Sequence, residues 1–375
     1  MNEDKKTKLN YLVYPFFLIT FILAALELVL RIYNPLSPRL KGDEIVLPIN
    51  QTLHITNLHV AGLDSNIVHT KNSIGFRGQN PPKDLGNSLS ILTVGGSTTE
   101  CRFISDGKTW EDLLNEKIKH RFNHVWLNNA GLDGHSTFGH LILTKKSLLQ
   151  LKPKVIIYLV GCNDVEVDKI KESDLNNVGT NAQNVKQFLN KHSELYSTFQ
   201  SLKKAYQAKK TGLTYNTEFD LPNRDTVTIS SDSLRQVLSY QQKFIPNYQK
   251  RVDSLIVLCK KSEILPVFIT QPNLSGNIKD EITGVDLSKI MLDNGMNGDT
   301  YWQVLKLYNQ ATQESCKKHK VLCIDLANRL PKSSAIFYDN IHYTNKGCES
   351  IAEIVSADLL PWLQTQFHSF LKPSN

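Results

Sequence analysis

Five short apolar runs constrain the fold of this chain more than any other feature of its sequence. They span residues 90–94, 125–128, 155–160, 265–270 and 321–325. Continuous apolar runs of this length are typical of strands buried on both faces of a parallel sheet. Helix-like stretches alternate with them, at residues 110–120, 138–150, 233–262 and 302–319. The alternation predicts an α/β fold, a three-layer α/β/α sandwich around a five-stranded parallel sheet.

One long apolar run, residues 11–30, lies near the start of the chain. A helix of about twenty residues spans roughly 30 Å, the thickness of a bilayer core. Glu27 is the one charged residue in this run, and Arg31 follows it at the spacing that lets two side chains pair on one helix face. A cleavable signal peptide is the competing interpretation, but a cut after Ala25 would leave several apolar residues on the mature protein. We therefore expect an uncleaved transmembrane anchor at residues 11–33.

The rest of the chain divides by composition. We expect residues 1–10 to form an N-terminal tail, residues 34–74 a linker or strap, and residues 75–370 one large domain. Two polar segments within that domain, at about 165–232 and 274–300, are longer than the usual connections of about 2–6 residues. Insertions that follow strand ends commonly shape a binding site or a lid, and we expect that role here.

Charge and cysteine content exclude several functional classes. The net charge is +7, but lysine and arginine are spread along the chain, so we expect no nucleic-acid partner. The six cysteines form no C-x-x-C pair, so we expect no metal site. Cys316 and Cys323 flank a short turn, and their spacing does not decide whether they form a disulfide. Positive charges flank the apolar run about equally, so they leave the membrane orientation open.

Residues that could take part in catalysis or binding follow the predicted strands. Because the carboxyl ends of parallel strands meet at one sheet edge, segments that follow different strands are expected to converge there. The first strand is followed by GGSTT, the second by NAGLDG, the third by GCND, and the fifth, after a loop, by YDNIHYT. The sequence therefore predicts that a serine, a glycine turn, an amide and an Asp/His pair meet at one place.

These blocks resemble those of the SGNH (GDSL-type) hydrolase superfamily, in particular a bacterial membrane-anchored branch of it. Ser97 matches the block I serine, Gly134 the block II glycine, and Asn163 the block III asparagine, while Asp339 and His342 match the block V D-x-x-H. Gly131 is the alternative for block II. The resemblance covers most of the chain downstream of the G-F-R-G segment at residue 75. It implies the flavodoxin-like α/β/α fold of that superfamily and no cofactor.

The resemblance also implies a mechanism. A serine hydroxyl becomes a nucleophile when a neighbouring base removes its proton, and His342 is the candidate base for Ser97. Asp339 would accept the other imidazole N–H and fix the tautomer. The oxyanion hole would consist of the backbone N–H groups of Ser97 and Gly134 and the side-chain amide of Asn163. We expect glycine at position 134 because a close backbone approach leaves no room for a Cβ atom.

One residue departs from the family pattern. The usual aspartate before the block I serine is Gly96 here, so the hydrogen bonding of this loop must differ. The resemblance implies a serine esterase that acts on O-acyl esters of lipids or glycans, with its domain outside the cytoplasm. An O-acyltransferase with the same site and a non-catalytic envelope binding module are the alternatives. The sequence leaves the oligomeric state open.

Overall fold

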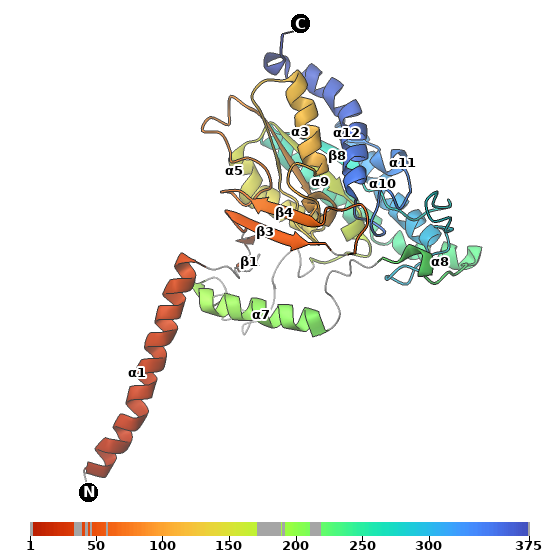
Figure 1. Ribbon diagram of the computed structural model, residues 1–375. Coiled ribbons are helices and arrows are strands. Elements are labelled where there is room, and N and C mark those ends of the chain that lie inside the picture. Colours follow the sequence, from red (N-terminus) through yellow and green to blue (C-terminus); the bar gives the residue numbers. More distant parts are fainter. Residues whose placement is uncertain are drawn as a thin grey trace. The chain divides into compact units, whose positions relative to one another are not determined.

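A parallel sheet of five strands forms the centre of the larger part of the chain (Figure 1). The computed structural model describes residues 3–33, 40–41, 44–45, 47–57, 59–170, 189, 192–210 and 219–373. The strands lie in the order β6 (Val125–Asn129), β5 (Leu89–Gly95), β7 (Val155–Val160), β8 (Leu265–Thr270) and β9 (Cys323–Ile324). The predicted α/β sheet is thus confirmed. The chain adds β6 on one side of β5 and β7 on the other, so the point where the order reverses lies between β5 and β7.

Helices cover both faces of this sheet because side chains along each buried strand alternate between the faces. On β7, Ile157 belongs to a core cluster with residues of α3 (Trp110–Arg121) and α12 (Asn345–Gln366), which pack together. The next residue, Tyr158, points the other way and contacts Cys259 of α9 (Ile245–Lys261). Helices α4 (Thr137–Leu143) and α10 (Gly298–His319) both pack on α9.

Two predicted helices are interrupted. The stretch expected at 233–262 is divided into α8 (Ser231–Gln241) and α9, because Pro246 lies at the start of α9, where its missing N–H is tolerated. The stretch expected at 138–150 contains a π-helical segment. The remaining short elements are α2 (Ser97–Glu100), Thr144–Leu148 (π-helix), α5 (Leu149–Leu151), α11 (Leu326–Arg329), and the 3-10 turns Cys162–Asp164, Leu221–Asn223 and His368–Phe370.

The segment expected to be a linker or strap contains two hairpins. Short strands β1 (Leu40–Lys41) and β2 (Glu44–Ile45) pair with each other, and β3 (Gln51–Thr56) pairs antiparallel with β4 (Asn66–Lys71). The β3–β4 hairpin belongs to the unit formed by Leu47–Asp174 and Asn216–Asn375, which also contains the sheet. This hairpin differs from the irregular linker or strap predicted for residues 34–74.

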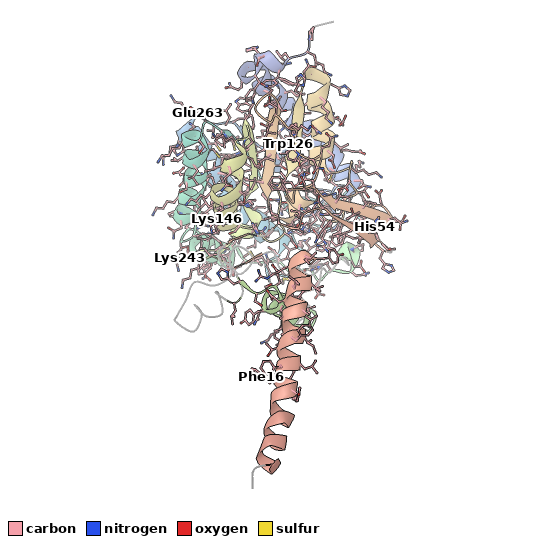
Figure 2. All side chains as sticks on the ribbon, turned by 90° about the vertical axis from the view of Figure 1, so that its left-hand side faces the viewer. Phe16, His54, Trp126, Lys146, Lys243 and Glu263 are labelled. Carbon is pink, nitrogen blue, oxygen red and sulfur yellow. The ribbon has the colours of Figure 1, made fainter. Side chains whose placement is uncertain are left out.

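A second unit is formed by Met1–Val46 and Leu175–Tyr215. It contains the long helix α1 (Glu3–Ile32) and α7 (Glu194–Lys210). Over Tyr14–Ile32 the mean hydropathy is 2.1 and no residue is buried, so this stretch is long and apolar enough to cross a membrane, although a signal sequence has the same properties. Phe16, for example, points outward from α1 (Figure 2).

The end of α1 contacts the start of α7 within this unit. Glu27 pairs with Arg31 at 2.9 Å, as their spacing predicts. The Glu27 carboxylate also accepts hydrogen bonds from the backbone N–H groups of Glu194 and Leu195, both at 3.0 Å. A carboxylate at this position satisfies the first free N–H groups of a helix. Glu27 therefore joins two segments that are far apart in the sequence.

The structure describes all six cysteines, and each of them is a free thiol. Cys316 and Cys323, whose spacing left a bridge open, are therefore not bridged. Burial raises the pKa of Cys259 to about 11, so this thiol is protonated at neutral pH.

Candidate active site

Ser97, His342 and Asp339 form a continuous hydrogen-bonded chain. The distance from Ser97 Oγ to His342 Nε2 is 2.8 Å, and that from His342 Nδ1 to Asp339 Oδ2 is 2.6 Å. Ser97 is the first residue of α2, directly after β5, and the hydroxyl does not cap this helix, because Gly96 occupies the cap position. The structure thus brings Ser97 together with an Asp/His pair that lies more than two hundred positions later in the sequence.

Local backbone contacts fix the carboxylate of Asp339. Its Oδ1 accepts hydrogen bonds from the N–H groups of Ile341 at 2.8 Å and His342 at 2.7 Å. Burial opposes the charged form, but the attraction and hydrogen bond of His342, together with these two N–H groups, hold the pKa of Asp339 below its ordinary value. The carboxylate is therefore ionised at neutral pH.

The pKa of His342 is shifted in the opposite direction. Burial favours the neutral imidazole, but the charge and hydrogen bond of Asp339, with a further contribution from Asp133, raise the pKa above the ordinary value of 6.5. The ring of Tyr338 stacks on the imidazole at 5.6 Å between centroids, with 10° between the planes. Asp339 and Tyr338 together hold the imidazole in one orientation, and the sequence analysis did not identify Tyr338.

The block II loop contains two glycines, Gly131 and Gly134, and each position requires glycine for a different reason. A Cβ atom on Gly131 would lie 2.5 Å from the backbone nitrogen of Glu100, so a close backbone approach requires glycine there. Gly134 has a φ of +74°, a conformation that favours glycine. The N–H of Gly131 donates to Asn129 Oδ1 at 2.8 Å. Among the residues that the structure describes, no acceptor contacts the N–H of Gly134.

Asn163 lies at the end of β7, across the reversal point of the sheet from Ser97. Its Nδ2 donates to the backbone oxygen of His135 at 3.0 Å, which fixes the direction of the amide. The structure therefore places all five residues singled out by the sequence at the carboxyl edge of the sheet, in the segments that follow β5, β6 and β7 and in the loop that precedes α12. Such an edge is where ligands bind to open parallel sheets.

Comparisons with known proteins give the family. The model of the GDSL-like lipase/acylhydrolase family matches residues 90–349, which is more than half of the chain. The chain belongs to this family. It is accordingly a hydrolase that acts on ester bonds. A search of curated proteins found no match.

The solved structures that this chain resembles are distant from it in sequence. A lipase/acylhydrolase from Enterococcus faecalis is 15% identical over 76% of this chain and 100% of its own, with a TM-score of 0.41. An acetylxylan esterase from Geobacillus stearothermophilus is 12% identical over 72% of this chain and 94% of its own, with the same TM-score.

Gly96, the departure from the GDSL pattern, has a structural explanation. A Cβ atom at this position would lie 2.2 Å from Nδ2 of Asn163 and 3.4 Å from the backbone oxygen of His135. The Asn163 amide therefore occupies the space into which a side chain at position 96 would begin to project. In this GDSL hydrolase, the absence of a side chain at position 96 lets the block III amide lie directly beside the block I turn.

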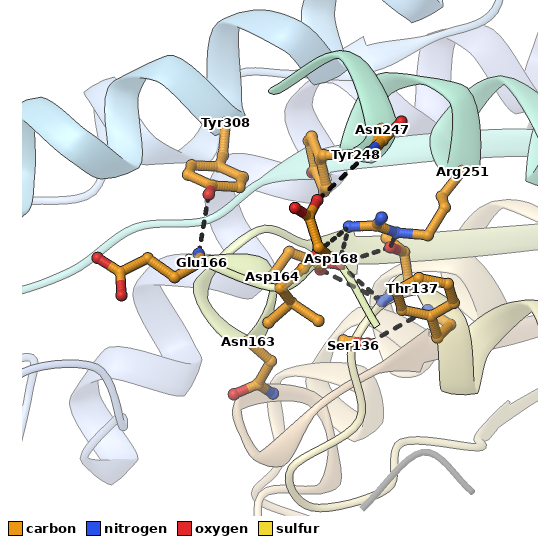
Figure 3. Close-up of polar contacts among 12 residues, drawn as sticks. Ser136, Thr137, Asn163, Asp164, Glu166, Asp168, Asn247, Tyr248, Arg251 and Tyr308 are labelled. Atoms are coloured by element: carbon orange, nitrogen blue, oxygen red, sulfur yellow. Dashed lines mark hydrogen bonds and ion pairs between the residues drawn. The ribbon is translucent and has the colours of Figure 1, made fainter. Parts of the chain in front are cut away.

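A buried acidic residue supports the block III turn (Figure 3). Asp164 is 1% exposed and accepts hydrogen bonds from the backbone N–H and the hydroxyl of Thr137, the first residue of α4. Arg251 of α9 donates to the same hydroxyl at 2.7 Å and lies 3.4 Å from the Asp164 carboxylate. Asp164 thus joins the turn that carries Asn163 to two helices.

A second buried cluster, which sequence reasoning missed, links the block I and block II loops. Glu100, at the end of α2, accepts a hydrogen bond from the N–H of Asp133 at 2.7 Å, and its other oxygen lies 3.6 Å from Lys71 Nζ. Arg77 donates to the backbone oxygen of Glu100 at 2.9 Å. Arg77 lies in the G-F-R-G segment noted in the sequence, and that segment was the available signal. Glu100 therefore fixes the distance between α2 and the Gly134 loop.

The wall of the site comes from the segments predicted to be insertions. A pocket of about 240 Å³ is lined by Asp339 and His342 together with Phe219, Arg224 and Tyr301. Arg224 lies over the ring of Phe219, 4.3 Å from its centroid, and pairs with Asp293. The lining residues at 219–224 and 292–294 lie in the two insertions, where we expected segments that shape the site.

Proposed function

We propose that this protein is a serine esterase that hydrolyses O-acyl esters through a covalent acyl-enzyme on Ser97. The Oγ of Ser97 attacks the carbonyl carbon of the ester while Nε2 of His342 takes the hydroxyl proton. The carbonyl π electrons move onto oxygen and form a tetrahedral intermediate. When this intermediate collapses, the C–O bond of the ester breaks and the alcohol leaves with the proton from His342. Water then attacks the acyl-enzyme by the same route and releases the acid and Ser97.

In this proposal, Asp339 stabilises the imidazolium that forms on His342 and keeps the tautomer in which Nε2 accepts from the serine hydroxyl. The negative oxygen of the intermediate would lie among three donors: the N–H groups of Ser97 and Gly134 and the amide of Asn163. Loss of one such donor typically raises the barrier by about 2.7–4 kcal/mol. The observation that carries the proposal is the Ser97–His342–Asp339 chain, with its two contacts of 2.8 and 2.6 Å.

Labelling with a fluorophosphonate tests the acyl-enzyme, because this reagent modifies a serine only when a base activates it. The wild-type protein should be labelled at Ser97, and Ser97→Ala and His342→Ala should abolish labelling. Ser73→Ala, at an exposed serine, is the matched control and should be labelled like the wild type. A folded wild-type protein that remains unlabelled would refute the proposal. Incubation of the acyl-enzyme with water or with a carbohydrate alcohol, followed by product analysis, separates a hydrolase from an acyltransferase.

We also propose that α1 remains attached as a membrane anchor and that the esterase lies outside the cytoplasm, where lipid or glycan esters are its substrates. The contacts of Glu27 with Glu194 and Leu195 support retention of α1, because the end of this helix takes part in folding of its unit. Labelling of single cysteines with a membrane-impermeant maleimide in intact cells tests the orientation. Protection of the catalytic domain until the membrane is permeabilised would contradict the proposed location.

A further inference from the structure

A second cavity lies beside the active-site pocket. Its volume is about 610 Å³, against about 240 Å³ for the pocket that contains Asp339 and His342. The two cavities share one lining residue, Phe219. A volume of this size is in the range of small-molecule sites, which run from about 300 to 1,000 Å³.

The cavity is close to the reacting atoms. Tyr338 contributes to its lining, and the ring of Tyr338 stacks on His342, whose Nε2 lies 2.8 Å from Ser97 Oγ. Phe219 lines both cavities, and the guanidinium of Arg224 lies on its ring. The partner of that guanidinium, Asp293, has a side chain that is 81% exposed. The larger cavity therefore begins one ring away from the pocket that contains His342, the residue that contacts Ser97.

The lining of the cavity is mainly apolar, with His59 and Asp220 among its polar residues. Apolar side chains form much of the lining, among them Val60, Leu221, Leu274 and Phe337. Exposed Ile282 extends the apolar surface outward, with 64% of its area accessible.

Three hydroxyl groups in the lining already donate hydrogen bonds within the protein. Thr283 and Ser334 donate to Asp280, at 2.6 and 2.8 Å, and Thr344 donates to the backbone oxygen of Ala335 at 2.6 Å. A carbohydrate would need such donors for its own oxygens, whereas a hydrocarbon chain needs none. The bonded state of these hydroxyls thus favours an acyl chain over a sugar ring.

We propose that this cavity binds the acyl chain of the substrate and that the esterase acts on esters of fatty acids with several carbons rather than on acetyl esters. The proposal rests on the proposed function at Ser97, and it adds the class of the acyl group. Phe219 is then the residue that separates the chain-binding cavity from the site of bond cleavage.

Binding of decanoate to the full-length Ser97→Ala protein in an amphipathic polymer tests the cavity without catalysis, by equilibrium dialysis against acetate as the reference ligand. We expect saturable binding of decanoate. Ala335→Phe and Ala61→Phe fill the cavity from two different segments and should each weaken binding about tenfold or more. Val257→Phe, on the partly exposed face of α9 away from the cavity lining, is the matched control and should bind like the parent. Because every variant is held in the same polymer, uptake of decanoate by the polymer itself cancels when the variants are compared.

Absence of decanoate binding, or equal binding by the filled variants and the control, would overturn the proposal. In the protein with Ser97 intact, a series of aryl esters from acetyl to decanoyl gives the second measurement. The filled variants should lose activity toward the long esters and retain it toward the acetyl ester. If decanoate binds as expected but no variant hydrolyses any ester, the cavity assignment holds and the esterase proposal fails, so the two failures are distinguishable.

Discussion

Replacement of Gly96 by alanine separates the activity of this esterase from its stability. The new Cβ atom would lie 2.2 Å from Asn163 Nδ2, a distance at which one of the two groups must move. The φ of Gly96 is −84°, outside the left-handed range that favours glycine, so we consider the contact with Asn163 as the cost of the added methyl group. The amide is the end of a side chain, and it can move away at little cost in folding free energy. That movement would break the hydrogen bond to His135.

The expected loss follows from the role proposed for Asn163. If the displaced amide no longer reaches the oxyanion, kcat should fall by about 10²–10³-fold, the effect of removing one oxyanion donor. KM should change little, because the donor acts mainly on the transition state. The midpoint of thermal unfolding should shift by no more than a few degrees. Gly96→Asp, which restores the usual family residue, should be at least as damaging as alanine in this chain.

Steady-state hydrolysis of an aryl ester, with thermal unfolding of each variant, provides the assay. Gly86→Ala is the control, because its Cβ atom would meet only a side-chain oxygen of Asp84, at 3.3 Å. A double-mutant cycle identifies the mechanism: once Asn163 is alanine, adding Gly96→Ala should cost almost nothing. Retention of kcat within about threefold in Gly96→Ala, or additive losses in the double variant, would refute the reasoning.

Three further predictions concern the base, the Glu100 contact and the Asp164–Arg251 pair. Because the pKa of His342 is raised above 6.5 and the base must be neutral, kcat/KM should rise with pH along a limb centred above 6.5. Asp339→Asn should move that limb to lower pH and lower the rate. A limb centred below 6.5 in the wild type would contradict this assignment. Glu100→Gln should lower kcat about tenfold or more with little change in KM, whereas an equal rise in KM would indicate a general structural defect. Arg251→Met should lower the free energy of unfolding in urea by about 3 kcal/mol, because the carboxylate of Asp164 would remain buried without this cation. A loss below about 1 kcal/mol would show that the pair is dispensable.

The contribution of His342 and Asp339 to folding stability also depends on pH, and the directions of their two pKa shifts decide whether it rises or falls. The raised pKa of His342 stabilises the fold below the ordinary value of 6.5, and this contribution is lost as the pH rises through the folded-state pKa. The lowered pKa of Asp339 stabilises the fold above its ordinary value of 3.8, and this contribution is lost as the pH falls through the folded-state pKa. Both contributions are present together between these values. Unfolding of wild type and Asp339→Asn at several pH values measures them.

The parallel sheet could be predicted without a structure, because strands buried on both faces must be apolar throughout, and this pattern is visible in the sequence. The sequence also predicted which residues meet at the edge of the sheet, since topology brings the carboxyl ends of parallel strands together. Ser97, Asn163 and His342 were found in this way. The expected long apolar helix is present as α1, and it was readable from length and composition alone.

The contacts that hold those residues, and the surroundings of the site, could not be predicted from the sequence. The bond from Glu100 to Asp133, the space left by Gly96 for Asn163, and the position of Phe219 between two cavities all join segments distant in the sequence. Periodicity reports which face of an element is buried, but it carries no record of the partner that buries it. Such contacts depend on the packing of side chains in three dimensions, where a single methyl group decides whether an amide fits.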